Sequence, residues 1–367
     1  MMNKMVFANL VHRPTRSIIT TSAIALEVTM ILMVVALFYG LLNGSKESQV
    51  GVGADLLVQP PGAAALAGMS GAPISVKVGG VLLKVPHVVV AAPVIWAFSQ
   101  KPLEIVYGID LRTYDMLPPK FVYLSGGPFQ GANDVIVDDF FSGMNHKKVG
   151  DTIEVLNHPF RISGIVPHGK GGRKFLPLET MQDLIGAEGR ASVFYVKLDD
   201  PARLDEVEKA IQGIPGMSNY AVRSMKEYLS MMTPDNLPGF DLAIKIVIGV
   251  AVVVGFLVIF QSMYTAVMER TREIGILKSL GASKLYIVNV VLRETMLLAA
   301  VGIVAGILIS LVTRRVIMFE RPVLRLFWSY EWVVRASVIA LAGALAGALY
   351  PAFKAAQRDP IDALAYE

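Results

Sequence analysis

The basic, glycine-rich stretch HGKGGRK, residues 168–174, is the first candidate for chemistry in this chain. Glycine-rich loops that carry a lysine cradle phosphate groups, but they do so in the spacing G-x-x-x-x-G-K-[ST] and directly before a helix. The stretch has neither the spacing nor a helical pattern after it, and the full spacing occurs nowhere in the chain. We therefore expect an exposed hairpin tip here and no nucleotide bound by this chain.

Other residue types that perform catalysis or hold metals show no useful arrangement. The chain has no cysteine and no G-x-S-x-G or H-E-x-x-H motif, which excludes thiolate sites and the common hydrolase and metalloprotease patterns. The five histidines are scattered without metal-ligand spacing; they are His12, His87, His146, His158 and His168. The sequence predicts no catalytic residue, no metal site and no cofactor bound by this chain.

Glu27 is a single acid inside a long apolar run that follows Arg16. At 1.5 Å per residue it lies about 14 Å into that run. An acid at such a depth is a functional candidate by default. The alternative is a structural role, in which the carboxyl is protonated or hydrogen-bonded within a dimer interface.

The composition indicates a chain whose excess of apolar residues lies in a lipid bilayer. Of its 367 residues, 54% are apolar and 17% charged, and the mean hydropathy is +0.53, more than a soluble core needs. A helix needs about 20 apolar residues to cross the hydrocarbon layer, and four runs reach or approach that length: 18–42, 244–268, 295–313 and 333–352. The chain has a net charge of +4, and its lysine and arginine residues cluster beside these runs. This position favours lipid headgroups over nucleic acid as their partner.

Small residues in the last two spans predict close helix packing. Gly302 and Gly306 lie four residues apart in one span, and Gly343 and Gly347 in the next. This spacing lets helix backbones approach each other in lipid, although glycine is also simply common in membrane helices.

Positive charge orients the spans only modestly, with the N-terminus inside. We expect a cytoplasmic N-terminal helix over residues 1–17, an outer loop over 314–332 and a cytoplasmic tail over 353–367. Residues 269–294 are expected in the cytoplasm, and residues 43–243 form one large domain outside it.

The large insertion reads as an α+β domain. Strands are predicted at 74–78, 103–109, 134–137, 160–166 and 193–198, each bounded by glycine, proline or asparagine. Helices are predicted at 201–211 and 224–232, where Ser224 and Glu227 have the spacing of a capping box. Residues 60–73, rich in glycine, alanine and proline, read as a flexible excursion. Met225, Tyr228, Leu229 and Met232 share one helical face, which we expect to be buried core rather than a ligand surface.

The segment MERTREIGILKSLGAS, residues 268–283, directly follows the second span. Its apolar residues recur at helical spacing among charged ones, which predicts a short amphipathic helix at the cytoplasmic interface that stops at Gly281. By periodicity alone a connector lying on the lipid surface is the better explanation of the segment, because interfacial helices between spans are common.

Three blocks of the chain resemble the MacB/FtsX-like family of ABC transporter permeases. They are residues 9–16 before the first span, residues 269–283 with Glu294 at the start of the third, and YPAFKAAQRDPIDAL over residues 350–364. The order of four spans with a large insertion between the first and second agrees, and residues 51–58 and 150–177 are similar to parts of the MacB-like periplasmic core domain. The resemblance implies an α-helical membrane protein of four transmembrane helices with an α+β extracytoplasmic domain, in the bacterial inner membrane.

The resemblance also implies partners. The segment after the second span would be a coupling helix that docks on a cytoplasmic ABC ATPase, a separate chain that binds ATP and Mg²⁺, and a second permease copy or paralogue would complete a dimer. The residues that would make the ATPase contact are Glu269, Arg270, Arg272, Glu273, Ile274, Leu277, Lys278, Leu280 and Gly281.

Two functions are compatible with such a permease. One is export or extraction of an amphiphilic substrate, with ATP hydrolysis moving the outer domain and a periplasmic adaptor assisting. The other is a transmembrane signal relay in the manner of FtsX, in which the outer domain activates a partner such as a cell-wall hydrolase.

Overall fold

The chain folds into two compact units, Met1–Leu41 with Pro238–Glu367, and Leu42–Leu237. We describe a computed structural model, which covers residues 14–61, 73–100, 103–233, 236, 239–320 and 325–357. The predicted N-terminal helix at 1–17, the excursion at 60–73 and the tail at 353–367 therefore lie wholly or largely outside the described residues.

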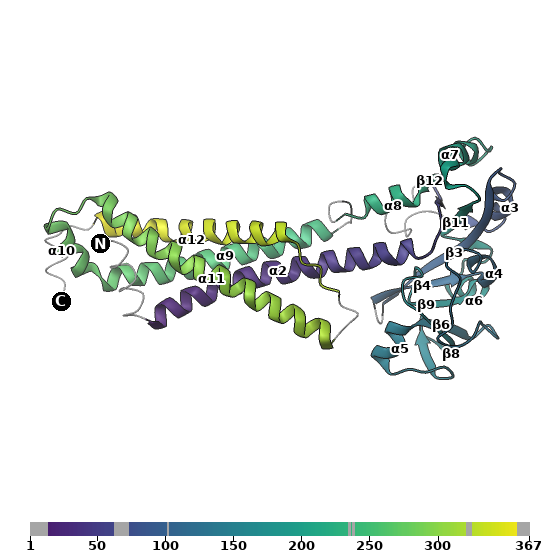
Figure 1. Ribbon diagram of the computed structural model, residues 1–367, viewed down its shortest axis with the longest axis horizontal. Helices are drawn as coiled ribbons and strands as arrows, with labels where there is room; N and C mark the ends of the chain where they lie inside the picture. The colour runs from purple at the N-terminus through teal and green to yellow at the C-terminus, as the bar shows by residue number, and fades with distance from the viewer. Residues whose placement is uncertain are drawn as a thin grey trace. The chain divides into compact units, whose positions relative to one another are not determined.

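The first unit consists of long helices that match the four predicted spans. They are α2 (Pro14–Val50), α9 (Phe240–Glu269), α11 (Lys284–Glu320) and α12 (Tyr330–Gln357), coloured purple, green and yellow in chain order (Figure 1). All four are long and apolar enough to cross a membrane. Each is longer than its predicted span, because hydropathy marks only the part in hydrocarbon, whereas the backbone hydrogen bonds continue into the headgroup layer. Residues 284–294 and 314–320 are accordingly helical.

Side chains from all four helices form the core of this unit. Ile24, Val28 and Ile31 of α2 pack with Ile259 of α9 and Leu298 of α11, and small alanines of α12 complete the cluster. Such small residues allow the helices to approach closely, which replaces the missing hydrophobic driving force in lipid.

Glycines mark the closest helix approaches. A Cβ added at Gly306 would lie 2.7 Å from the carbonyl oxygen of Ala25, and one at Gly302 would lie 2.8 Å from the Cβ of Ile24. A Cβ at Gly347 would lie 3.0 Å from the carbonyl oxygen of Phe256. Gly302 and Gly306 thus lie against α2, and Gly347 lies against α9.

The second unit is the α+β domain inserted between the first and second spans. Its strands are β1 (Leu56–Gln59), β2 (Ile74–Ser75), β3 (Val88–Gln100), β4 (Leu103–Ile109), β5 (Ser125–Gly126), β6 (Asp134–Asp138), β7 (Thr152–Val155), β8 (His158–Val166), β9 (Lys174–Pro177), β10 (Arg190–Ala191), β11 (Val193–Leu198) and β12 (Ala221–Ser224). In the described part of the chain, one sheet has the order β12-β1-β11-β3-β4-β9-β6-β8-β5, with β7 beside β8, and β10 pairs with β2 separately.

Short helices connect the strands and cover two apolar clusters. They are α3 (Val78–Leu82), α4 (Leu111–Tyr114), α5 (Asp139–Asn145), α6 (Leu178–Ile185), the 3₁₀ turn η1 (Pro201–Arg203), α7 (Leu204–Gln212) and α8 (Met225–Met231). Val207 and Ile211 of α7 pack on Phe194 and Val196 of β11 in one cluster. Met181 of α6 packs in the other, with residues of β4, β6 and β8.

Most strand predictions are confirmed, and two differences have clear physical reasons. Residues 103–109 and 193–198 are strands with the predicted bounds, but only Ile74 and Ser75 of the predicted strand 74–78 are extended. Val76 and Lys77 form a turn instead, and α3 begins at Val78 with Gly79 and Gly80 in its first turn. The long strand β3 was not predicted because Pro93 lies in its middle, yet Pro93 occupies a ladder position opposite Phe194.

The prediction of an exposed hairpin tip at residues 168–174 is wrong. The flanking strands β8 and β9 both pair with β6 and not with each other, so the segment crosses over within the sheet. Lys170 is buried and donates from Nζ to the carbonyls of Val52, Leu117 and Pro119. The segment's first lysine thus satisfies backbone acceptors inside the domain and has no free ammonium group for a phosphate.

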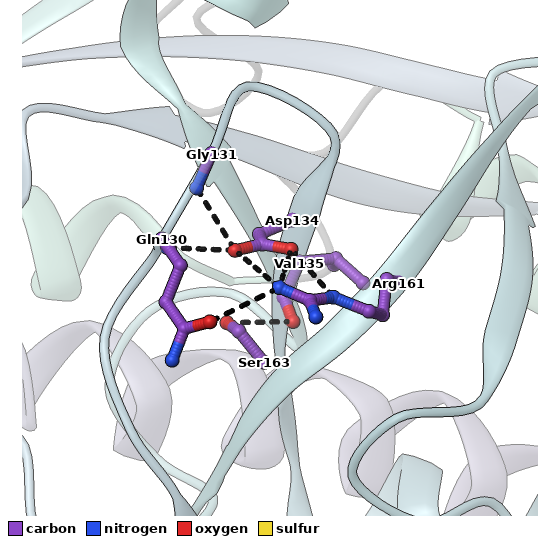
Figure 2. A network of polar contacts seen from close by, with 6 residues as sticks. All are labelled: Gln130, Gly131, Asp134, Val135, Arg161 and Ser163. Atoms are coloured by element: carbon purple, nitrogen blue, oxygen red, sulfur yellow. Dashed lines mark hydrogen bonds and ion pairs between the residues drawn. The ribbon is translucent and has the colours of Figure 1, made fainter.

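Asp134 ties the loop before β6 to β8 (Figure 2). Its buried carboxylate accepts hydrogen bonds from the backbone nitrogens of Gln130 and Gly131, at 2.6 and 3.0 Å. The guanidinium of Arg161 donates to the same carboxylate at 3.0 Å and to the side chain of Gln130 at 3.2 Å. The network fixes the start of β6 against its parallel neighbour.

The helical face at residues 225–232 is confirmed as core. Met225, Tyr228 and Met232 are buried, with Leu229 half-buried. The Oγ atom of Ser224 accepts a hydrogen bond from the backbone nitrogen of Glu227 at 3.0 Å, which is half of the predicted capping box.

Candidate functional site

The segment after α9 forms α10 (Thr271–Ser279), the predicted short amphipathic helix. It ends where expected, because Gly281 adopts φ of +92°, a left-handed conformation that favours glycine. The backbone nitrogens of Gly281 and Ala282 donate to the carbonyls of Lys278 and Leu277, each at 3.0 Å. This pair of bonds is a Schellman motif and fixes the direction in which the chain leaves the helix.

One face of α10 is held by the chain's own helices. Ile274 is buried in a cluster with Val267 of α9, Ile287 of α11 and Ala352 of α12. Thr271 and Gly275 are buried on the same face, and the Nζ of Lys278 donates to the carbonyl of Ala356 at 3.1 Å. The helix is therefore anchored to three of the long helices at once.

A buried ion pair joins the start of α10 to α11. The Nη1 atom of Arg270 lies 2.9 Å from Oε2 of Glu294, and the two side chains are 12% and 4% exposed. With so little water around it, the pair resists screening and fixes the bend between α9 and α10. Both residues belong to the second block of the resemblance, residues 269–283 with Glu294, but the sequence does not predict that they pair, since no helical spacing relates residues so far apart.

The opposite face of α10 is open. Leu280 is 80% exposed and Ile276 is 44% exposed, beside exposed Arg272 and Glu273. Leu277 lies between the two faces and lines a small apolar cavity of about 50 Å³ formed with α9 and α11. Exposed apolar residues rimmed by charges form a surface suited to another protein.

The nine residues predicted to contact an ATPase thus have different positions. Ile274 is buried inside the chain, Arg270 and Lys278 hold α10 in place, and Leu277 is half-buried. Those on the open face or beside it are Glu269, Arg272, Glu273, Leu280 and Gly281. Ile276 also lies on this face but is not among the nine predicted residues. Its signal in the sequence is an apolar side chain that lies outside the helical spacing of Ile274 and Leu277.

Glu27 lies inside the membrane unit, at the position where α2 meets α9 and α12. Its side chain is 4% exposed, and neither carboxylate oxygen has a hydrogen-bond partner among the described residues. A Cβ added at Gly255 would fall on the carboxylate, and one at Gly343 would lie 3.9 Å from Oε1. Two glycines on neighbouring helices therefore make the room that Glu27 occupies.

Comparison with known families covers nearly the whole chain. The model of the MacB-like periplasmic core domain matches residues 17–214, and that of the FtsX-like permease C-terminal region matches residues 245–360. Residues 215–244, which include β12, α8 and the start of α9, lie between the two matches.

Similar proteins include macrolide export ATP-binding/permease proteins MacB. That of Nitrobacter winogradskyi is 27% identical over 66% of this chain, and that of Salmonella paratyphi A is 30% identical over 60%. The matched regions span only 39% and 35% of those relatives. A protein of Staphylococcus haemolyticus named as a hemin transport system permease, HrtB, is 26% identical over 70% of both chains.

Among solved structures, the periplasmic region of MacB from Actinobacillus actinomycetemcomitans is similar over 52% of this chain and 95% of that one, at 15% identity and a TM-score of 0.39. The four apolar helices, the inserted α+β domain and the two family matches agree with one another. The chain belongs to the MacB/FtsX-like family of ABC transporter permeases and is a multi-pass protein of the bacterial inner membrane.

Proposed function

We propose that this permease couples ATP hydrolysis by a separate cytoplasmic ABC ATPase to movement of its outer domain, with α10 as the docking element. The anchored position of α10 supports the proposal most strongly. Force applied at Leu280 or Ile276 passes through Ile274 and the Arg270–Glu294 pair into the long helices, because these contacts are buried and closely packed. A connector resting on lipid would need no such attachment.

The proposed cargo is an amphiphilic molecule that is exported or extracted from the membrane, by a dimer of this chain or of this chain with a paralogue. The names of the relatives support this class, since macrolides and hemin both combine apolar and polar parts. ATP and Mg²⁺ belong to the ATPase partner, and a periplasmic adaptor is a further proposed partner.

The test is co-purification of the tagged chain with its ATPase from detergent, together with ATP hydrolysis by the recovered complex. Leu280→Asp is the sharpest variant, because the residue is 80% exposed and its replacement leaves the fold of this chain intact. If Leu280 fills a groove on the ATPase, a charge there costs several kcal/mol of association, and the complex should dissociate.

Two matched variants complete the design. Val122→Asp introduces the same charge at an exposed apolar residue of the outer domain and should leave the complex intact. Arg272→Ala on the rim of α10 should weaken association by less than about 1 kcal/mol. Wild-type partner binding and ATP hydrolysis by Leu280→Asp would show that α10 is a connector and not the docking element.

A further inference from the structure

Glu27 has no counter-ion among the residues that the structure describes. It is the only charged residue in the four apolar segments 17–45, 246–262, 295–313 and 336–353. Its carboxylate is 96% buried and forms no hydrogen bond with any residue that the structure describes. All charged groups of the neighbouring helices therefore lie toward the membrane surfaces.

An unpartnered carboxylate in such surroundings is unfavourable in either protonation state. Ionised, it carries a charge out of water without the hydrogen bonds that normally compensate for that loss. Protonated, it presents a hydroxyl donor with no acceptor. Intramembrane acids that persist in spite of this penalty mark sites for ions, protons or ligands.

The carboxylate lies between glycines of α9 and α12. It lies against Gly255 on one side and near Gly343 on the other. A Cβ built on Gly343 would lie 3.9 Å from Glu27 Oε1, an ordinary van der Waals distance, and would meet no other atom within 4 Å. Only the backbone of Gly343 therefore borders the carboxylate on the α12 side, and a larger residue at this position would crowd it.

A large apolar hollow lies on the far side of Gly343. It has a volume of about 580 Å³ and lies between α9 and α12 in the apolar part of the bilayer-spanning region. Among the described residues its walls are apolar and come from both helices, with Val253 and Phe256 on α9 and Ile339 and Gly343 on α12. Gly343 thus belongs to the hollow and also borders the carboxylate.

We propose that Glu27 and this hollow form a membrane-facing binding site for an amphiphile that carries a cationic nitrogen. The apolar body of the ligand occupies the hollow, and its ammonium group passes Gly343 to pair with the carboxylate. A cation satisfies the charge and the lone pairs of Glu27 together. A lipid acyl chain or an apolar helix of a second copy would fill the hollow but leave the carboxylate unpaired.

The site concerns this chain alone, so it is tested without the ATPase. The full chain in lipid nanodiscs is titrated with a dansyl-labelled long-chain alkylamine and, separately, with the N-acetylated, uncharged form of the same molecule. Fluorescence anisotropy is corrected with empty nanodiscs of the same lipid. We expect Glu27→Gln to weaken binding of the amine by about tenfold or more, because a charge-assisted pair is lost. The acetylated probe should bind wild type and Glu27→Gln equally.

A second pair of variants tests the path past Gly343. Gly343→Leu places a branched side chain between the hollow and the carboxylate and should weaken binding of the amine as strongly as Glu27→Gln does. Gly249→Leu is the matched control, since a Cβ there meets nothing within 4 Å and binding should be unchanged. Equal amine affinity in wild type and Glu27→Gln would overturn the proposal.

The occupant of the hollow is checked in the same cysteine-free background. Val253→Cys places a thiol on the wall of the hollow. Efficient disulfide cross-linking between two copies would mean that a second copy covers the hollow, which also overturns the proposal. Protection of this cysteine from a lipid-soluble maleimide at a lower concentration of the amine than of the acetylated probe would support it.

Discussion

Arg270 and Glu294 form an ion pair, with 2.9 Å between Nη1 and Oε2, at the point where α9, α10 and α11 meet. Removing one member leaves the other charge buried and unpaired, which destabilises a protein by about 3–5 kcal/mol. We expect Arg270→Ala to lower the midpoint of thermal unfolding of the detergent-purified chain clearly, and ATPase coupling to fall with it. Arg272→Ala, on the exposed face of α10, is the control; equal midpoints for the two variants would show that the pair does not hold α10.

Gly306 marks the closest approach of α11 to α2. An added Cβ would lie 2.7 Å from the backbone oxygen of Ala25. Because a backbone atom cannot move aside as a side chain can, the two helices would have to separate. Gly306→Leu should therefore cost about 1–3 kcal/mol or more, as overpacked cores do. The measurement is the unfolding midpoint in detergent, with Gly249→Leu as the matched control. Unchanged stability in Gly306→Leu would mean that the two helices pack differently from this arrangement.

Asp138 gives the outer domain a pH dependence opposite to that of most acids. It is buried, and desolvation raises its pKa from 3.8 to about 6, while the Phe141 amide, Arg173 and His168 oppose the rise and Asp139 adds to it. Because the folded state then binds a proton more tightly than the unfolded state, this group favours folding below about pH 4. That contribution to the free energy of unfolding, at most about 3 kcal/mol, is lost as the pH rises to about 6.

Asp138→Asn removes this titration but keeps an oxygen for the cap bond to the backbone nitrogen of Phe141, at 2.6 Å in the wild type. Outer-domain unfolding is read from the fluorescence of Trp96 after Trp328 and Trp332 are changed to Phe. Between pH 4 and 6 the wild type should lose stability relative to Asp138→Asn, and above pH 6 the difference should be constant. If the unfolding free energies of wild type and Asp138→Asn changed with pH in parallel throughout, Asp138 would have an ordinary pKa.

The network in Figure 2 predicts unequal effects for its two charged members. Asp134→Ala removes at once the acceptor of the part-buried Gln130 and Gly131 amides and of the Arg161 guanidinium, which should cost about 1–3 kcal/mol in total. Arg161 is 52% exposed, so Arg161→Ala leaves Asp134 its two amide partners and should cost about 1 kcal/mol. Unfolding followed by Trp96 fluorescence distinguishes the two, and equal effects would contradict the dominance of the amide bonds.

Much of the fold could be predicted from the sequence because the bilayer and the strand ladder impose strong periodic patterns. The four spans show as unbroken apolar runs, and β4 and β11 show as β-branched runs between turn residues. Strand β3 escaped prediction because Pro93 breaks its pattern, and residues 168–174 were misread because lysine is rarely buried. Only tertiary structure supplies the three backbone carbonyls that Lys170 satisfies.

The candidate sites show a sharper limit. The spacing of Ile274, Leu277 and Leu280 predicts one apolar face, yet periodicity cannot tell a face that packs on the chain's own helices from one left for a partner. The structure separates them, with Ile274 buried and Leu280 exposed. Glu27 stood out in the sequence as a charge in an apolar run, but nothing in the sequence relates it to Gly255, which is brought to it only by the packing of α2 on α9.

The proposed topology places the outer domain and α10 on opposite sides of the membrane, and the cysteine-free chain permits a direct test. Val122→Cys and Ser279→Cys each put a thiol at an exposed position, one in each region. An impermeant maleimide added to cells whose outer membrane is permeabilised should label position 122 and not position 279, because only the former faces the periplasm. Disruption of the inner membrane should then expose position 279 to the same reagent, which shows that the thiol is reactive. Labelling of position 279 before that disruption, with none at 122, would invert the topology and remove α10 from the reach of a cytoplasmic ATPase.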